Sequence, residues 1–221
     1  MRSVRIWFTK CDTAKYISHL DLTRCFIRAF RRTDIPLWYT EGFNPHPHLV
    51  FGLSLPLGAE GINEAVDIRL DDDSYPNERI LEELNRVTVN GIRFLKIAEP
   101  EFKALDVVKA KYRIIIPAGG TSPQQLSELV KSKIESGNII IEKKTKKKEI
   151  KQINAGEYID SPEYRITENA VELELFLPAG NEFTINPISF CNSLTADILK
   201  NGEVCRVIRL NLFVKDGGEY R

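Results

Sequence analysis

The chain has 221 residues, of which 43% are hydrophobic and 28% are charged. This composition is typical of a globular protein with a buried core, and the length allows one large domain or two small ones. The 31 basic and 31 acidic side chains cancel, so net charge alone excludes a general attraction of the whole surface to nucleic acid.

The charge is unevenly distributed along the chain. Residues 1–58 carry eight basic and four acidic side chains, residues 59–106 carry six and twelve, and the remainder carries seventeen and fifteen. A polyanion is therefore expected to meet the first segment or a local patch, not the whole surface.

The sequence shows no targeting signal. No apolar run is long enough to cross a bilayer or to form a signal peptide, so membranes are not expected partners. The four cysteines are widely spaced, without a C-x-x-C pair, which indicates reduced thiols in a cytoplasmic protein.

The first half of the chain alternates between strand and helix patterns. Residues 3–9 alternate apolar and polar side chains, as a strand does. A helix is predicted over His19–Arg32, with Ser18 as its N-cap, Asp21 at the capping-box position, and Phe26 and Phe30 facing the core. Further strands are predicted at residues 48–55, 64–70 and 92–97, and a further helix from Pro76.

The second half shows the same order of elements. Strands are predicted at residues 109–116, 138–142, 170–177 and 203–214, with helices starting at 122 and 186. The fold class predicted is therefore α+β, with two tandem ferredoxin-like (βαββαβ) units at residues 1–102 and 107–221. The second unit includes a Lys-rich segment at 143–151, a pattern that is typical of a solvated hairpin or loop.

Four arginines share the polar side of the first predicted helix. Arg24, Arg28 and Arg31 recur one turn apart, and Arg32 lies beside them. Neighbours on a helix surface are about 5–6 Å apart, so the row suits contact with a phosphate backbone or an acidic partner. The alternative is a solvated helix face.

All three histidines lie in this first segment. His19 begins the predicted helix, where the helix dipole favours a neutral imidazole. General acid–base chemistry on an RNA 2′-hydroxyl by His19 or His46 is one hypothesis. The other is a histidine that is hydrogen-bonded to the loop and holds Gly42 to Pro47 against the helix. Together with His48 and Asp21, they show no diagnostic ligand spacing, so no metal site is predicted.

The loop at 41–47 contains Gly42, Pro45 and Pro47, which exclude regular structure. Trp38 and Phe43 lie beside Asn44 and His48, and aromatic rings near cations form stacking platforms for unpaired bases. The alternative is that these rings fill the gap between helix and sheet.

Several segments resemble those of the radical-SAM-linked protein family, closely over residues 3–70 and more loosely beyond. The matching segments read SHLDL at 18–22, RRTDIP at 31–36, EGFNPHP at 41–47 and FGLSLPLG at 51–58. The resemblance implies a small protein that works beside a radical SAM enzyme in an RNA-related role.

A radical SAM enzyme needs three closely spaced cysteines for its [4Fe–4S] cluster, and the four cysteines of this chain are too far apart in the sequence to form such a motif. The partner is therefore expected to carry the cluster and S-adenosylmethionine, and this chain no cofactor. The tandem layout also resembles CRISPR repeat-cleaving endoribonucleases, although Gly217-Gly218 is too short for their glycine-rich loop.

The expected function is an accessory RNA-binding subunit that presents substrate to a radical SAM partner, without catalysis of its own. DNA is not an expected partner. Two alternatives stay open: a metal-independent endoribonuclease using His19 or His46, and a protein-binding module whose arginines meet an acidic surface.

Overall fold

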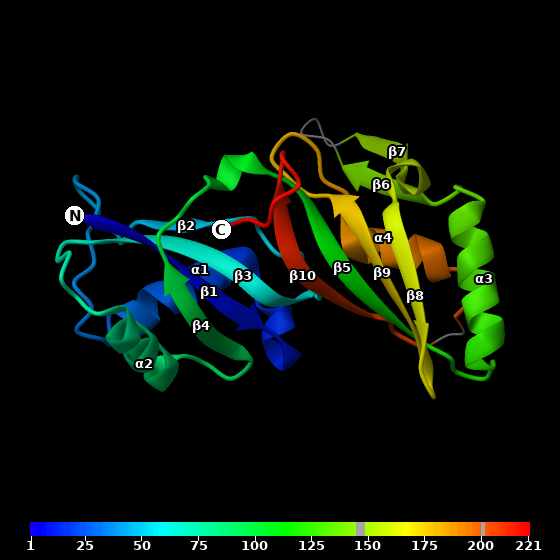
Figure 1. Ribbon diagram of the computed structural model, residues 1–221, viewed down its shortest axis with the longest axis horizontal. Coiled ribbons are helices and arrows are strands. Elements are labelled where there is room, and N and C mark those ends of the chain that lie inside the picture. Colours follow the sequence, from blue (N-terminus) through cyan, green and yellow to red (C-terminus); the bar gives the residue numbers. More distant parts are fainter. Residues whose placement is uncertain (145–148, 200–201) are drawn as a thin grey trace. The chain divides into compact units, whose positions relative to one another are not determined.

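The computed structural model describes residues 1–144, 149–199 and 202–221, and these form an α+β protein of two compact units (Figure 1). Unit 1 contains Met1–Val108 and Asn211–Arg221, and unit 2 contains Lys109–Leu210. The α+β class predicted from the sequence is confirmed.

Unit 1 combines an antiparallel sheet with two helices. Its strands run in the order β4, β1, β3, and β2 also pairs with β3. The bounds are β1 Arg2–Lys10, α1 His19–Phe30, β2 Leu49–Phe51, β3 Glu60–Leu70, α2 Asn77–Val87 and β4 Ile92–Ala98, with 3-10 turns at Asp12–Tyr16 and Ala104–Asp106. The end of β10 (Arg206–Val214) and the chain that follows it belong to this unit.

One face of the sheet in unit 1 packs against both helices. Side chains alternate between the faces of a strand, and Val4 of β1 pairs with Ile68 of β3 on the face toward the core. The core residues from the two helices are Leu22, Phe26, Phe30, Ile80 and Leu84. The opposite face carries the intervening side chains, among them Arg5, Asp67 and Arg69.

Helix α1 begins where its N-cap signal predicts. The Ser18 hydroxyl accepts a hydrogen bond from the Asp21 backbone N–H at 3.2 Å and donates one to the Asp21 carboxylate at 2.7 Å. Phe26 and Phe30 are buried as expected, and the Phe26 ring meets Phe8 edge-on at a centroid distance of 4.9 Å. The helix ends two residues before the predicted end, a normal uncertainty for a helix terminus.

Unit 2 has its own sheet segment and two helices. Its strands run in the order β10, β5, β9, β8, and β9 pairs antiparallel with both β5 and β8. The bounds are β5 Val107–Pro117, α3 Pro123–Glu135, β6 Ile140–Lys144, β7 Ile150–Asn154, β8 Asp160–Ile166, β9 Ala170–Pro178 and α4 Pro187–Thr195, with a 3-10 turn at Ala155–Tyr158.

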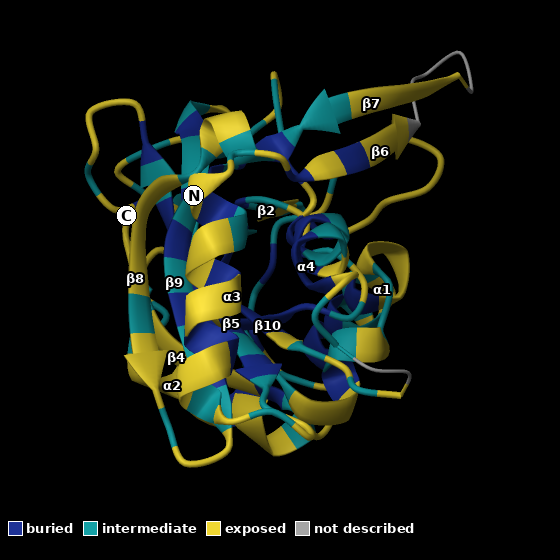
Figure 2. Ribbon diagram, turned by 90° about the vertical axis from the view of Figure 1, so that its right-hand side faces the viewer, coloured by how far each residue is buried: buried dark blue, intermediate teal, exposed yellow. Residues whose placement is uncertain are grey.

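In the second half of the chain, the strands predicted from the sequence differ from the observed strands at two places. The strand predicted at 138–142 is β6, and it forms a separate two-stranded hairpin with β7. The sheet position beside β9 is taken by β8, which is mostly exposed (Figure 2) and contains Pro162. Such an edge strand has no buried side to produce alternating hydrophobicity, so the sequence pattern misses it.

The Lys-rich segment falls partly within this hairpin. The Lys143 ammonium donates to the Thr184 carbonyl at 3.1 Å and lies 5.1 Å from the centre of the Phe183 ring. Lys151 is exposed on β7. The lysines at 146–148 lie outside the described residues.

Candidate binding surfaces of unit 1

The exposed side of α1 carries the predicted arginine row. Arg24 pairs with Asp21 at 3.1 Å, and the Arg28 guanidinium lies 3.6 Å from the Cys25 sulfur. Arg28 and Arg31 are exposed, and neither has a carboxylate within ion-pair distance among the described residues. Two of the arginines can therefore reach an anion without breaking an internal salt bridge. We call Arg24, Arg28 and Arg31 the arginine row.

The neighbouring Asp21 stays charged in this setting. The Ser18 hydroxyl, followed by the Arg24 guanidinium, lowers the pKa of the Asp21 carboxyl. The positive charge of Arg24 is therefore partly compensated, which leaves Arg28 and Arg31 as the stronger anion contacts.

Arg32 occupies a different place from the other three arginines. Its guanidinium donates to the Val87 carbonyl at 3.3 Å, at the end of α2. It lines a surface pocket of about 270 Å³. The charged residues of that pocket are Arg32, Arg79, Arg86, Asp34, Glu82 and Glu83. Three cations and three carboxylates balance, so this pocket adds no net positive charge to the row.

Glu83 has a clear structural role in that pocket. It accepts hydrogen bonds from the Tyr75 hydroxyl at 2.7 Å, from Arg79 at 2.9 Å and from the Asp34 backbone at 2.9 Å. The Tyr75 hydrogen bond is the main cause that lowers the pKa of Glu83. Its carboxylate thus ties the chain after α1 to α2.

His19 lies on the first turn of α1 and is exposed. Its ring meets Phe51 edge-on at a centroid distance of 5.0 Å, and Phe51 packs on Phe26 at 5.4 Å. The imidazole therefore borders the core at the helix N-terminus, with part of its surface open to solvent.

The loop with the second histidine is a small hairpin. Tyr39 and Pro47 form an antiparallel bridge. Nδ1 of His46 lies 3.1 Å from the Thr40 hydroxyl and 3.2 Å from the Asn44 carbonyl oxygen, and the Thr40 backbone N–H donates to the His46 carbonyl at 2.9 Å. These contacts hold His46 within its own hairpin, and none of them is with α1.

The two aromatic residues predicted to stack bases differ in access. Phe43 at the hairpin tip, beside the exposed Asn44, is fully exposed at 105% of its reference area. Trp38 is half-buried: its ring meets His48 at 5.9 Å, and the Arg69 guanidinium lies 5.5 Å from the ring centre. Only Phe43 presents an open ring face.

His48 lines a second pocket on the sheet face away from the helices. The pocket measures about 430 Å³ and lies within unit 1. Its principal lining residues are Ser3, His48, Val50, Arg69, Pro100 and Lys103. Burial, and then the charge of Arg69, lower the pKa of His48, and its buried Nδ1 has no hydrogen-bond partner among the described residues. We call this cavity the His48 pocket.

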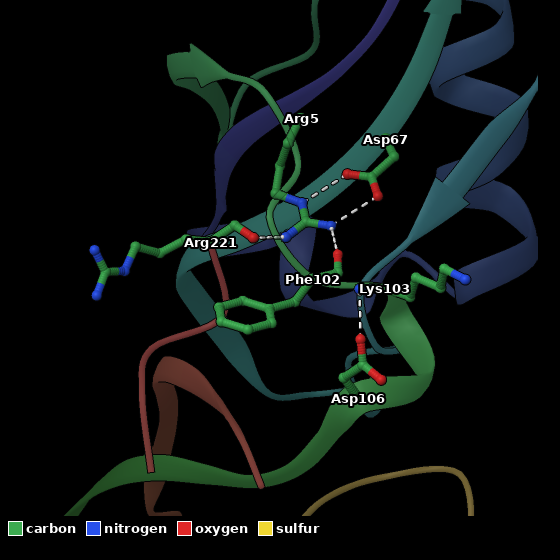
Figure 3. A network of polar contacts seen from close by, with 6 residues as sticks. All are labelled: Arg5, Asp67, Phe102, Lys103, Asp106 and Arg221. Atoms are coloured by element: carbon green, nitrogen blue, oxygen red, sulfur yellow. Dashed lines mark hydrogen bonds and ion pairs between the residues drawn. The ribbon is translucent and has the colours of Figure 1, made fainter. Parts of the chain in front are cut away.

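A buried arginine holds the outer wall of the His48 pocket in place (Figure 3). Arg5 is 0% exposed and makes a bidentate contact with Asp67 at 2.7 and 2.8 Å. It also donates to the Phe102 carbonyl at 2.6 Å and to the Arg221 carbonyl at 2.5 Å. The Lys103 backbone N–H donates to the Asp106 carboxylate at 2.7 Å. The segment at 100–106 is thus pinned to the sheet.

The structure separates the predicted site residues into two surfaces. Leu49 pairs with Ile68, whose side chain faces α1, while Val50 pairs with Asp67, whose side chain faces the other way. Because side chains alternate between faces, the arginine row and the His48 pocket lie on opposite sides of the sheet in unit 1. They cannot act on one atom of a small ligand.

Sequence reasoning missed the residues that complete the His48 pocket. Asp67 and Arg69 show the polar side of an alternating strand, so their face is predictable. That residues 100–104 and the buried Arg5 enclose this face depends on contacts up to 216 positions apart, which no local pattern reveals.

Two findings concern classes of protein that depend on metals or membranes. In the described parts of the chain, no group of three or more His, Cys, Asp or Glu side chains is placed to hold a metal ion. Nor does any described helix have the length and apolar character required to span a bilayer.

The structure thus defines an α+β protein with two candidate ligand-binding surfaces in its first unit. The chain belongs to the family described as "Uncharacterized protein conserved in bacteria (DUF2344)", which matches residues 3–187. No curated protein matches the chain. A crystal structure of an unknown protein from Galdieria sulphuraria is 9% identical, with a TM-score of 0.28, over 94% of this chain and 98% of that one. The family description names no substrate and no partner.

Proposed function

We propose that this protein is an accessory RNA-binding subunit that presents RNA to a partner radical SAM enzyme. The observation that carries the RNA part is the arginine row on α1, in which Arg28 and Arg31 are exposed without a carboxylate partner among the described residues. The radical SAM partner, with its cluster and S-adenosylmethionine, comes from the sequence resemblance alone.

The geometry of the row suits a flexible polyanion. Side chains three or four positions apart on a helix are about 5–6 Å apart, so Arg24, Arg28 and Arg31 present three guanidinium groups in a line. Guanidinium is weakly hydrated and forms bidentate contacts with phosphate oxygens. A single strand can adapt its backbone to this spacing, which makes single-stranded RNA the better fit.

Binding without catalysis is the proposal for this chain. Nδ1 of His46 is engaged with Thr40 and Asn44 inside the hairpin, and His19 borders Phe51. A general base must reach its substrate proton within hydrogen-bond distance, and these contacts favour a structural use of both rings.

The test is a salt titration of single-stranded RNA binding to wild type, Arg28→Ala and Phe43→Ala. With three phosphate contacts, log affinity should fall with log salt at a slope of about −2, and Arg28→Ala should reduce that slope by about 0.7. Phe43→Ala should instead weaken binding by about 1–3 kcal/mol with little change in slope, if the ring stacks on a base.

Arg93→Ala is the matched control, because Arg93 is an exposed arginine on β4 of the same unit. It should leave affinity and slope unchanged. An Arg28→Ala variant that binds RNA with wild-type affinity and slope, or wild type that binds none at low salt, would refute the proposal. A protein-binding role for the arginines would then be the better explanation of the arginine row.

We infer further that both units are ferredoxin-like. In unit 1 the order β4, β1, β3, β2 with antiparallel neighbours supports this, as does the order β10, β5, β9, β8 in unit 2. Both are the order that a split βαβ arrangement produces. An experimental structure with a different strand order in either unit would contradict it.

A further inference from the structure

The His48 pocket has the dimensions and lining of a small-molecule site. Its volume of about 430 Å³ falls within the range of about 300–1,000 Å³ that is usual for ligand pockets. Val50, Pro100 and Ala104 supply apolar surface, and six of the eleven lining residues are polar or charged. This mixed lining suits a ligand that carries both an apolar ring and polar groups.

The charges at the pocket favour an anionic ligand. Arg69 and Lys103 are cations at its rim, and Asp67 and Glu101 are the acids. Asp67 is already bound at both oxygens by Arg5, so its charge is compensated. The remaining balance is two cations against one carboxylate, which suits a phosphate or carboxylate group on the ligand.

The planar groups favour an aromatic ring beside that anion. His48 and Arg69 both line the pocket, and imidazole and guanidinium planes are surfaces on which heteroaromatic bases stack. Burial, and then the charge of Arg69, lower the pKa of His48, which favours the neutral imidazole, a form that can both donate and accept a hydrogen bond through its ring nitrogens. Its buried Nδ1 has no partner among the described residues, and a buried polar atom normally has one.

The pocket is built before any ligand arrives. Arg5 ties the Phe102 carbonyl to β3, and the Glu101 and Phe102 backbone N–H groups donate to the Arg221 carbonyl at 2.9 and 3.0 Å. The wall therefore needs no ordering when a ligand binds, which reduces the entropic cost of binding.

We propose that the His48 pocket binds a nucleotide, either free or as one residue of a strand. The base lies against His48 and Arg69, and the phosphate is held by Arg69 and Lys103. This site is independent of the arginine row, from which it is separated by the sheet of unit 1, and it goes beyond the RNA-binding function proposed for α1.

The test is isothermal titration calorimetry of the full chain with AMP, CMP, GMP, UMP and inorganic phosphate. At least one mononucleotide should bind with a Kd below about 1 mM, and inorganic phosphate should bind at least about tenfold more weakly. A short single-stranded oligonucleotide serves as the second arm, measured on wild type and on the pocket variant Arg69→Met: weaker oligonucleotide binding in Arg69→Met identifies a strand as the source, and unchanged oligonucleotide binding identifies the free nucleotide.

Two variants locate the binding in this pocket. Arg69→Met keeps the aliphatic stem beside Trp38 but removes the charge, and Lys103→Ala alters an exposed side chain. Each should weaken mononucleotide binding by about tenfold or more, since each removes a charge-assisted contact. Thermal melts should show that both variants remain folded. Arg93→Met, which lies outside the pocket, should bind as wild type does.

Arg28→Ala separates this inference from the function proposed for α1, because it should change strand binding but leave mononucleotide binding intact. The inference is overturned by no binding of any mononucleotide at about 5 mM. It is also overturned if both Arg69→Met and Lys103→Ala bind the mononucleotide with wild-type affinity, or if inorganic phosphate binds as tightly as the best nucleotide.

Discussion

The buried Arg5–Asp67 pair gives a prediction whose size follows from the structure. Asp67→Ala removes the carboxylate that accepts from Nε and one Nη of Arg5 at 2.7 and 2.8 Å. Arg5 is 0% exposed, so water cannot replace these hydrogen bonds. The backbone oxygens of Phe102 and Arg221 still accept from the guanidinium, but they do not replace the bidentate contact with a carboxylate.

The expected loss of stability is large for one substitution. Removing one partner of a buried ion pair costs about 3–5 kcal/mol, because the other charge is left uncompensated. For a protein of this size, each kcal/mol lowers Tm by about 2–4 °C, so a decrease of roughly 10 °C is expected.

Urea unfolding followed by circular dichroism measures the effect. The matched control is Asp197→Ala, which removes an exposed carboxylate that pairs with Lys133 at 3.3 Å. Exposed ion pairs contribute about 0.2–1 kcal/mol, so the control should unfold close to wild type. The double variant Arg5→Met/Asp67→Ala should lose less than the sum of the two single variants, since their effects are coupled by direct contact.

The reasoning is refuted by an Asp67→Ala variant whose unfolding free energy lies within about 1 kcal/mol of wild type. Strict additivity in the double variant would refute it equally, because it would show that the pair acts as two independent residues.

Two further predictions concern backbone geometry and pH. Gly91 and Gly58 both have positive φ, 83° and 87°, so alanine at either position costs about 1–2 kcal/mol. At Gly91 the new Cβ would also lie 2.5 Å from the Cys11 carbonyl oxygen, whereas at Gly58 nothing lies within 4 Å of it. Urea unfolding should therefore show that Gly91→Ala is less stable than Gly58→Ala. Equal unfolding free energies of the two variants would contradict this. The pKa of His48 is lower in the folded protein than in the unfolded chain. The neutral His48 ring therefore contributes to the free energy of unfolding above a pH of about 6.5, and this contribution is lost as the pH falls through the folded-state pKa. NMR titration, with His48→Gln for assignment, should place its midpoint below 6.5, and a midpoint at or above that value would disprove the assignment of burial as the dominant effect.

Local signals in the sequence determined most of the elements. The amphipathic pattern and the Ser18 cap define the start and buried face of α1, and Ser122 caps α3 in the same way through the Gln125 backbone N–H. Alternation predicts β1, β3 and β9 because apolar side chains at every second position of these strands face the core. These signals work because capping and amphipathic burial involve residues only a few positions apart.

The same local logic predicted which of the candidate arginines are exposed, but not which candidate residues meet. The arginine row is exposed as the helix periodicity predicts. Trp38, however, lies on the opposite face of the sheet. Its ring contacts both His48 and Arg69, and Arg69 belongs to a strand more than thirty positions further along the chain.

Only the tertiary structure decided that an arginine on the polar side of β1 is buried. Read locally, Arg5 is the solvent-facing residue of an alternating strand. In the fold, Phe102 and Arg221, which are 97 and 216 positions away, bring their carbonyl groups over it, and Asp67 supplies the charge. A buried guanidinium is tolerable only when such partners satisfy it, and partners at that separation are set by strand order and register, which short-range patterns do not contain.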